Sequence, residues 1–268
     1  MAHVDYVMWA EYVFELLQQH HPVADDILEL GCGTGSLALV LQPIGAYSYH
    51  ASDSSEEMLA VARRKTRQAR IPISFEHMDF RAVPPEPQYD AILLLYDGIN
   101  YITEPTEIAA VLEGAYRALR PGGVFIFDHS TPANSLMHSD GFDDAGQGGA
   151  FRFLRTSRYD ADTRLHTTLF RLGVDGKTHT ERHVQRAYTQ DEIRALIGAS
   201  AFSLEAGYDG FTFEPAGEDS ERIHHVLRRP KEAVELHALP QAGGRSSTAS
   251  QVPNSKYQIP SGLMKHPL

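Results

Sequence analysis

One stretch near the N-terminus, DILELGCGTGS over residues 26–36, constrains the fold more than any other part of the chain. Its first half holds a brief apolar run, Ile27, Leu28 and Leu30, as expected for a buried parallel strand. Its second half has glycine at alternate positions, and an apolar segment that suits a helix follows it. Glycines let a backbone approach a ligand closely, and a helix start offers unpaired N–H groups. The stretch therefore predicts a strand–turn–helix site for a nucleotide or nucleoside.

The glycine spacing and one acidic residue narrow the choice of ligand. A dinucleotide site follows the pattern G-x-G-x-x-G and binds a phosphate at the helix N-terminus, whereas here Ser36 takes the sixth position. Glu29, two residues before the first glycine, would repel pyrophosphate but could receive an ammonium group, directly or through water. These features disfavour a nicotinamide dehydrogenase. An ordinary tight turn between strand and helix stays open as the alternative.

The pattern E-x-G-x-G-x-G over residues 29–35 resembles motif I of the class I S-adenosylmethionine (SAM) dependent methyltransferases. The resemblance implies SAM as the cofactor. It also implies an α/β fold, a doubly wound seven-stranded mostly parallel sheet of the Rossmann-like kind, here with an inserted antiparallel β lobe. In that family the turn wraps the methionine part of SAM. The residues that this assigns to the cofactor are Glu29, Gly31, Cys32, Gly33 and Gly35.

A second acidic residue, Asp53, ends the strand predicted over residues 46–52 and lies 18 residues past Gly35 (53 − 35). A carboxylate at the tip of the second strand can accept hydrogen bonds from both ribose hydroxyls. The alternative is a cap for the helix predicted over 54–70, but Ser54 or Ser55 can cap it. We therefore assign Asp53 and the adjoining Ser54 to the cofactor. Met58, one turn into that helix, packs either on the adenine or on the sheet.

Further cofactor contacts are implied by the resemblance at the ends of the next two strands. After the strand over 73–78, the family has an acidic residue that accepts from the adenine amino group, and the next backbone N–H meets a ring nitrogen. Asp79 and Phe80 fit these places, although a plain loop carboxylate is the alternative. The apolar run 89–96 predicts a central strand covered on both faces. Its last residues, Leu95 and Tyr96, would hold the methionine end through their backbone.

Candidate acceptor residues follow the central strands, because ligands of open α/β sheets bind beyond the carboxyl ends of strands. Asn100 could cap a turn or bind the acceptor, and Tyr101 could orient it or pack on the helix predicted over 105–120. His129, at the end of the strand over 124–127, is a candidate base or acceptor ligand, or a structural histidine. Arg186, with His183 and Tyr188, could contact the acceptor as well, and the alternative is that each is a plain exposed strand residue.

The segment after His129 departs from a minimal methyltransferase. Residues 133–149 are polar and rich in glycine, which predicts a mobile loop. Three runs typical of strands follow over 150–159, 164–174 and 178–188, with a hairpin at residues 175–176. Such an inserted antiparallel lobe resembles the acceptor lobe or dimer-forming ribbon of small-molecule N- and O-methyltransferases. We therefore expect it to face the acceptor, and a homodimer could form through it.

The domain organisation expected from these patterns has four parts. They are a SAM-binding core over 1–132, the inserted loop and lobe over 133–188, a closing helix and strand hairpin over 189–230, and a flexible tail over 231–268.

Composition limits the partners and the compartment. The formal net charge of −11 disfavours binding to nucleic acid. One cysteine, no signal peptide at the N-terminus and no apolar run near the roughly 20 residues of a membrane span predict a cytoplasmic protein without membrane contact. Although there are 14 histidines, none falls in a metal-binding spacing, so we expect no metal.

These observations predict an enzyme that moves the methyl group of SAM to a nitrogen or oxygen nucleophile of a small molecule. A neutral amine would need no general base. An oxygen acceptor would need one, and His129 or Tyr101 would serve. A SAM-binding regulatory protein without catalysis and a protein or RNA methyltransferase stay open as alternatives.

Overall fold

The computed structural model describes residues 4–86, 88–137, 142–148, 151–174 and 177–231. The chain divides into two units, Met1–Glu232 and Ala233–Leu268. The second unit, with most of the predicted tail, lies outside the described residues, and so does the hairpin predicted at 175–176.

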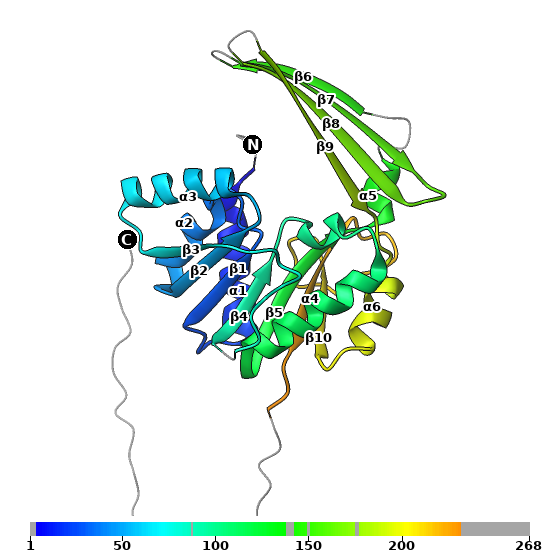
Figure 1. Cartoon of the computed structure of the whole chain (residues 1–268). Coiled ribbons are helices and arrows are strands. Elements are labelled where there is room, and N and C mark those ends of the chain that lie inside the picture. Colours follow the sequence, from blue (N-terminus) through cyan, green and yellow to red (C-terminus); the bar gives the residue numbers. More distant parts are fainter. Residues whose placement is uncertain (1–3, 87, 138–141, 149–150, 175–176, 232–268) are drawn as a thin grey trace, which may run out of the picture. The chain divides into compact units, whose positions relative to one another are not determined.

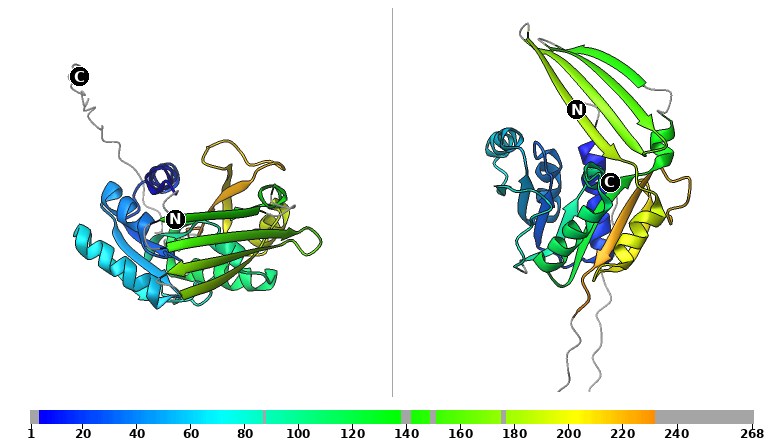
Figure 2. Two further views of the ribbon diagram at one scale, coloured as in Figure 1. Left: turned by 90° about the horizontal axis from the view of Figure 1, so that it is seen from above. Right: turned by 45° about the vertical axis from the view of Figure 1, so that its right-hand side comes forward.

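The first unit contains a seven-stranded sheet in the order β10-β11-β5-β4-β1-β2-β3, drawn in Figures 1 and 2. Neighbouring strands are parallel except at β11, which runs antiparallel to β5 and β10. The strands are β1 (Asp26–Leu30), β2 (Ser48–Asp53), β3 (Ile73–His77), β4 (Tyr89–Leu94), β5 (Leu119–Ser130), β10 (Ser203–Asp209) and β11 (Arg222–Arg228). The predicted fold class is confirmed, including the antiparallel closing hairpin.

Helices cover both faces of this sheet, as Figure 1 shows. One hydrophobic core joins the sheet to the first three helices, and a second core joins its other face to α4 and α6. Asp5 caps the first helix by accepting from the backbone N–H groups of Val7 and Met8. The helices are α1 (Tyr6–His20), α2 (Ser36–Gly45), α3 (Glu56–Ala69), α4 (Pro105–Ala118) and α6 (Gln190–Gly198), with a short 3₁₀ helix η1 (Gly98–Tyr101).

A second, antiparallel sheet of four strands, in the order β6-β7-β8-β9, is inserted between β5 and α6. Its strands are β6 (Phe142–Gly148), β7 (Phe151–Asp160), β8 (Leu165–Val174) and β9 (Lys177–Arg186). The three strands predicted from the sequence are confirmed within one or two residues at most ends.

The loop predicted over 133–149 was wrong, because this segment contains the helix α5 (Pro132–Leu136) and the strand β6. Its high glycine content favoured a loop over a strand in the prediction. A Cβ on Gly146 would lie 2.4 Å from the ring of Phe153 on the neighbouring strand, so glycine is needed there for packing rather than for a turn.

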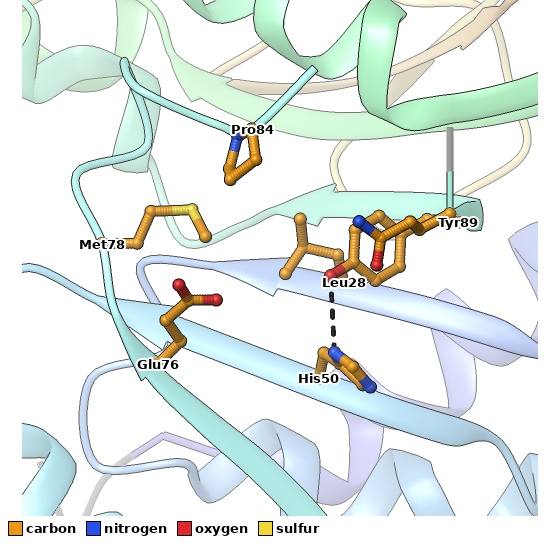
Figure 3. A pocket seen from close by; sticks show the side chains of 7 residues that line it. Leu28, His50, Glu76, Met78, Pro84 and Tyr89 are labelled. Carbon is orange, nitrogen blue, oxygen red and sulfur yellow. Dashed lines mark hydrogen bonds between the residues drawn. The ribbon is translucent and has the colours of Figure 1, made fainter. Parts of the chain in front are cut away.

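Residues 78–88 connect β3 to β4 without a helix in their described part. A cavity of about 270 Å³ lies there, against the sheet face that α4 covers (Figure 3). Its lining includes Leu28, His50, Glu76 and Tyr89, which come from within strands rather than from their carboxyl ends. It is therefore separate from the site built below.

Candidate functional site

The predicted cofactor residues meet at the carboxyl ends of the parallel strands. The strand order reverses between β1 and β4, since β2 and β3 follow on one side and β5 on the other. Ligands of open α/β sheets bind at such a switch point. The glycine turn follows β1 there, Asp53 ends β2, and Tyr96 follows β4.

The three glycines of the turn serve different needs. Gly31, Gly33 and Gly35 all have left-handed backbones, with φ of 65°, 55° and 67°. A Cβ on Gly35 would lie 3.1 Å from Ala62, so this glycine permits α2 to approach α3. A Cβ on Gly33 would meet no atom within 4 Å, because the turn faces open space at this residue. The turn therefore leaves open space beside Gly33 in which a ligand can approach the backbone.

Lys65 of α3 fixes this turn, a contact that was not predicted from the sequence. Its ammonium donates to the Thr34 carbonyl oxygen at 2.9 Å and to Ser36 Oγ at 2.7 Å. Partial burial lowers its pKa. Its partner Ser36, at the first position of α2, lies 29 residues away in the sequence, so no local pattern announces the contact.

Asp53 joins the glycine turn to the second strand. Its Oδ2 accepts from the Gly33 N–H and its Oδ1 from the Ser55 N–H, both at 2.8 Å. Ser55 caps α3 by accepting from the Met58 N–H, so the cap is served without Asp53. Each carboxylate oxygen has further lone pairs, so Asp53 can still accept from a diol. Its predicted ribose contact stays a prediction.

Glu29 is buried beneath the turn, with 5% of its surface exposed. Tyr49 donates a hydrogen bond to its Oε2 at 2.9 Å. Burial raises the pKa of Glu29 to about 8, the Tyr49 hydrogen bond lowers it and the nearby Asp53 raises it. Without a ligand this carboxyl is mostly protonated at neutral pH, and a cation bound nearby would favour its ionised form.

Asp79 and Phe80 lie beyond the end of β3. The Asp79 carboxylate is bound by the Arg81 guanidinium at 2.6 Å, and Arg81 also pairs with Glu107 at 2.8 Å. The hydrogen bonds from Arg81 hold the pKa of Asp79 below its usual value. The Phe80 ring lies 3.9 Å from where a Cβ on Gly31 would be. Arg81 was not predicted, and any adenine contact of Asp79 would share the carboxylate with it.

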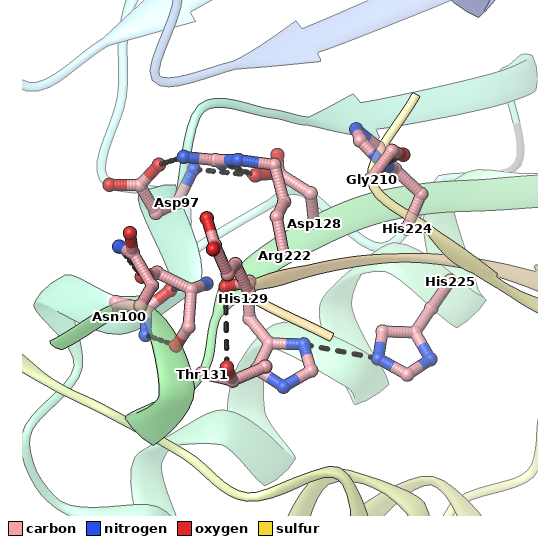
Figure 4. A network of polar contacts seen from close by, with 12 residues as sticks. Asp97, Asn100, Asp128, His129, Thr131, Gly210, Arg222, His224 and His225 are labelled. Carbon is pink, nitrogen blue, oxygen red and sulfur yellow. Dashed lines mark hydrogen bonds and ion pairs between the residues drawn. The ribbon is translucent and has the colours of Figure 1, made fainter. Parts of the chain in front are cut away.

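The turn that leaves β4 is strained and held by a buried ion network (Figure 4). Tyr96 and Asp97 have φ of 64° and 50°, which side chains rarely adopt. Asp128, fully buried at the end of β5, accepts from the Asp97 N–H at 3.0 Å. Arg222 of β11 pairs with Asp97 at 2.6 Å and also with Asp128. Burial raises the pKa of Asp128 to about 6, although Arg222 opposes this.

Aromatic rings lie against the same network. The Trp9 ring of α1 and the Tyr96 ring have centroids 5.5 Å apart. The Arg222 guanidinium carbon lies 5.5 Å from the Trp9 ring and 5.9 Å from the Tyr96 ring. Sequence reasoning missed Arg222, because it lies nearly a hundred residues from its Asp128 partner in the chain.

Asn100 fastens three elements together. Its amide nitrogen donates to the Ser130 carbonyl oxygen at 2.8 Å and to the Arg186 carbonyl oxygen at 2.7 Å. Its amide oxygen accepts from the Ser130 N–H at 2.9 Å. Asn100 has 1% of its surface exposed, and its side-chain hydrogen bonds connect η1, which carries it, to β5 and β9. The geometry favours the structural alternative over the predicted acceptor contact.

Tyr101 is the exposed member of the predicted acceptor residues, with 47% of its surface accessible. Its hydroxyl lies 2.9 Å from Nδ1 of His183 on β9, and Phe170 packs edge-on against that imidazole at 5.4 Å. Burial, then the charge of Asp97, raises the pKa of Tyr101 to about 12. The phenol is therefore protonated at neutral pH and can donate a hydrogen bond.

His129 and Arg186 occupy less accessible positions. His129 is fully buried, with Nδ1 3.1 Å from Nε2 of His225, and burial lowers the pKa of His129 to about 3. Neither solvent nor an acceptor reaches it in this arrangement, which favours the structural alternative. Arg186 lies 3.6 Å from Glu192 and stacks over Tyr188.

The described residues contain no group of three or more histidine, cysteine, aspartate or glutamate side chains placed to hold a metal ion. Within the same residues, we find no helix with the length and hydrophobicity that crossing a membrane requires.

Comparisons with known proteins agree with this architecture. The family model described as "Methyltransferase domain" matches residues 27–123. A protein of Geobacillus sp. (strain WCH70), named as a candidate methyltransferase, is 28% identical over 85% of this chain and 95% of its own length. The dTDP-3-amino-3,6-dideoxy-alpha-D-glucopyranose N,N-dimethyltransferase of Streptomyces fradiae is 26% identical over 75% of this chain and 79% of its own. The solved structure of an S-adenosylmethionine-dependent methyltransferase from Clostridium acetobutylicum ATCC 824 has a TM-score of 0.76 at 25% identity, covering 85% of this chain and 94% of that one.

Proposed function

We propose that this chain, which belongs to the class I SAM-dependent methyltransferases, moves the methyl group of SAM to an amino nitrogen of a small molecule. The observation that carries the proposal is the pairing of two features at one edge of the sheet. One is the acid-lined glycine turn, open at Gly33, and the other is the exposed pair Tyr101–His183.

SAM is the cofactor of this family, and the residues around the turn suit it. A methionine moiety fits the open approach at Gly33, a ribose fits the remaining acceptor capacity of Asp53, and a cationic group suits the neighbourhood of Glu29. When bound, SAM supplies an activated methyl group on a sulfonium. We infer that Tyr96 and Leu95 border its methionine end, because both lie at the exit of β4.

The chain's own contribution is positioning, which can account for roughly 7–11 kcal/mol of a barrier. Tyr101 would accept a hydrogen bond from the N–H of the acceptor amine while its own O–H can be donated to Nδ1 of His183, which orients the phenol and leaves the nitrogen lone pair free to attack the methyl group. An amine that arrives neutral needs no base before transfer. The burial of His129 and the protonated phenol of Tyr101 leave neither of the two predicted bases ready for an oxygen nucleophile, which favours nitrogen. The Streptomyces fradiae relative is also named for an amino group.

The proposal is tested by titrating the protein with SAM, S-adenosylhomocysteine and NAD in a calorimeter, and then by measuring S-adenosylhomocysteine formation with a panel of amines and alcohols. We expect SAM to bind, NAD not to bind, and methylation of amines. Replacement Tyr101→Phe should lower the rate of transfer and leave SAM affinity unchanged. Transfer to alcohols but not amines, or an unchanged rate in the Tyr101 variant, would contradict the assignment.

A further inference from the structure

We propose that the acceptor amine is carried on an apolar body without phosphate, and that Tyr101, Leu136, Met137 and Phe170 contact this body. The inference rests on the proposed function, because it concerns the acceptor of the same site. It departs from the Streptomyces fradiae relative, whose named acceptor is a nucleotide-linked sugar.

The first support is the distribution of cationic residues in the sequence. Residues 1–62 contain no lysine or arginine, and neither do residues 82–116 or 121–151. These ranges include the glycine turn, the exits of β4 and β5, and α5. A nucleotide diphosphate is usually held by arginine or lysine at the point where it binds. The segments that surround the carboxyl ends of the central strands have none to offer.

Several cationic side chains that other segments bring to this region are already paired with carboxylates, while Lys65 donates to Thr34 and Ser36 of the glycine turn. Arg222 binds Asp97 and Asp128, and Arg164 binds Glu192 with both its terminal nitrogens, at 2.6 and 2.7 Å. Arg155 lies 3.6 Å from Asp144. A phosphate entering here would have to compete with these carboxylates and would also be repelled by them.

The sheet β6–β9 turns its exposed arginines away from the core, whereas Lys177, six residues before His183 on β9, lies on the inner face. Strand residues alternate between the two faces. His183 and Gln185 of β9 contact Tyr101 and Asp97, at 2.9 and 3.1 Å, so their face is the one that meets the core. The strand register places Phe170 and Arg155 on that face. The opposite face carries the remaining arginines of these strands that are exposed, Arg152, Arg158, Arg171 and Arg182.

Helix N-termini are the other common phosphate sites, and three of those near this edge carry acidic residues, whereas α2, which starts at the glycine turn, has none in its first turn. The first turn of α3 has Glu56 and Glu57, that of α4 has Glu107, and that of α6 has Asp191 and Glu192. These carboxylates compete with any phosphate for the helix ends.

Exposed apolar side chains occur in the segments that lack cations, at the end of α5 and on η1. Leu136 and Met137, at the end of α5, expose 54% and 63% of their surfaces, and Tyr101 exposes 47%. Ser135 beside them contacts His166, at 3.2 Å, from the same sheet face as Phe170. Exposed apolar residues on η1 and at the end of α5, the latter next to the inner face of β8, favour an apolar ligand.

The test compares acceptors that differ in phosphate. With SAM as donor, S-adenosylhomocysteine formation is measured for tyramine, tyramine O-phosphate, a free amino sugar and dTDP-3-amino-3,6-dideoxyglucose. We expect kcat/KM for tyramine to exceed that for its phosphate by at least about tenfold. A preference for the phosphorylated amine or the nucleotide sugar overturns this inference and leaves the proposed function standing. Transfer to alcohols only, or to no member of the panel by a protein that binds SAM, overturns the proposed function and this inference with it.

Two neighbouring residues on opposite faces of β8 give a matched pair. Phe170→Ala should raise KM for the apolar amine by about tenfold and leave SAM affinity unchanged, whereas Leu169→Ala should change neither. Equal effects of the two variants would overturn the assignment of the inner face.

A charge can also be supplied. Met137→Arg should raise the relative kcat/KM for tyramine O-phosphate several-fold, while Thr180→Arg, at an exposed position on the outer face, should not. No gain with Met137→Arg, or an equal gain with Thr180→Arg, would show that α5 does not border the acceptor.

Discussion

Gly33 and Gly35 lie two residues apart in one turn and have nearly the same backbone angle, yet they face different surroundings. The space beside Gly35 is filled by Ala62 and Phe75, and the space beside Gly33 is open. Glycine at position 35 therefore serves the fold, whereas glycine at position 33 serves whatever approaches the turn. The sequence pattern could not separate these two roles, because it contains only the spacing.

Gly33→Ala should weaken SAM binding at least about tenfold while lowering the free energy of unfolding by only about 1 kcal/mol, the cost of a left-handed alanine. Gly210→Ala is the matched control, because Gly210 also has a positive φ and open space beside it. It should show a similar loss of stability with unchanged SAM affinity. Calorimetric titration and urea unfolding measure the two quantities, and intact SAM binding by the Gly33 variant would remove this residue from the site.

Glu29→Gln should change how stability depends on pH in the ligand-free protein. The pKa of Glu29 rises from 4.5 in a solvated chain to about 8 in the fold, so the folded state keeps a proton that the unfolded state releases. The contribution of Glu29 to wild-type stability is thus fully present below pH 4.5. It is lost as the pH rises toward 8, by about 1.4 kcal/mol for each pH unit.

Because glutamine does not titrate, the free energy of unfolding of the variant should rise relative to that of the wild type between pH 5 and pH 8. Urea unfolding of both proteins at several pH values measures the difference. A constant difference across this range would mean that the Glu29 carboxyl is ionised in the fold.

At the scale of elements, Arg222 joins strands that are far apart in the chain. It extends from β11 to carboxylates at the ends of β4 and β5 and lies over the rings of Trp9 and Tyr96. The strained residues Tyr96 and Asp97 depend on this support. The closing strand therefore does more than complete the sheet, since it also fixes the exit of β4.

Arg222→Met should lower the free energy of unfolding at pH 7 by about 3–5 kcal/mol, because it leaves the buried Asp128 without its counter-charge. The loss should shrink as the pH falls from 7 toward 6, because removing Arg222 raises the pKa of Asp128 above its wild-type value of about 6 and the carboxyl becomes protonated. Arg171→Met, at an exposed residue on the outer face of β8, should be nearly neutral at both pH values. A loss that does not change with pH would exclude Asp128 as its source.

Elements with strong local patterns could be predicted from the sequence, and those held by distant contacts could not. The apolar run over 89–96 predicted the strand β4 correctly, and the predicted closing helix is α6, whose first turn is stabilised by a capping box at Thr189. The strand β6 was missed because Gly146 packs against a ring that belongs to another strand. For the site, the turn and Asp53 were found through their spacing. Lys65 and Arg222 were missed because their partners lie 29 and 94 residues away.

At the scale of the whole molecule, three fully buried histidines link the closing strand to the core. His129 and His225 stack with centroids 5.1 Å apart, and His224 packs against Trp9 and Tyr12. Burial lowers the pKa of His129 and His224 from 6.5 to about 3 and that of His225 well below 6.5. The fold thus holds all three neutral where an unfolded chain would bind protons.

The contribution of these three histidines to stability should therefore be fully present above pH 6.5 and should be lost as the pH falls toward 3, because the unfolded state takes up protons that the folded state does not bind. Between pH 7 and pH 5, the free energy of unfolding should fall less steeply in His225→Gln than in the wild type, because the variant takes up one proton fewer on unfolding. Thermal unfolding at these pH values, with His179→Gln at an exposed residue as control, measures this. Parallel curves for the wild type and the His225 variant would show that His225 does not contribute.

The acidic residues around the glycine turn also bear on product release. SAM carries a positive sulfonium, and S-adenosylhomocysteine, with a neutral thioether, does not. Asp53 offers a carboxylate at this edge, and a bound cation favours the ionised form of Glu29 beneath the turn, so the site attracts SAM more than S-adenosylhomocysteine. Methyl transfer thus removes the positive charge of the bound cofactor. We therefore expect S-adenosylhomocysteine to inhibit only weakly, most evidently at low ionic strength.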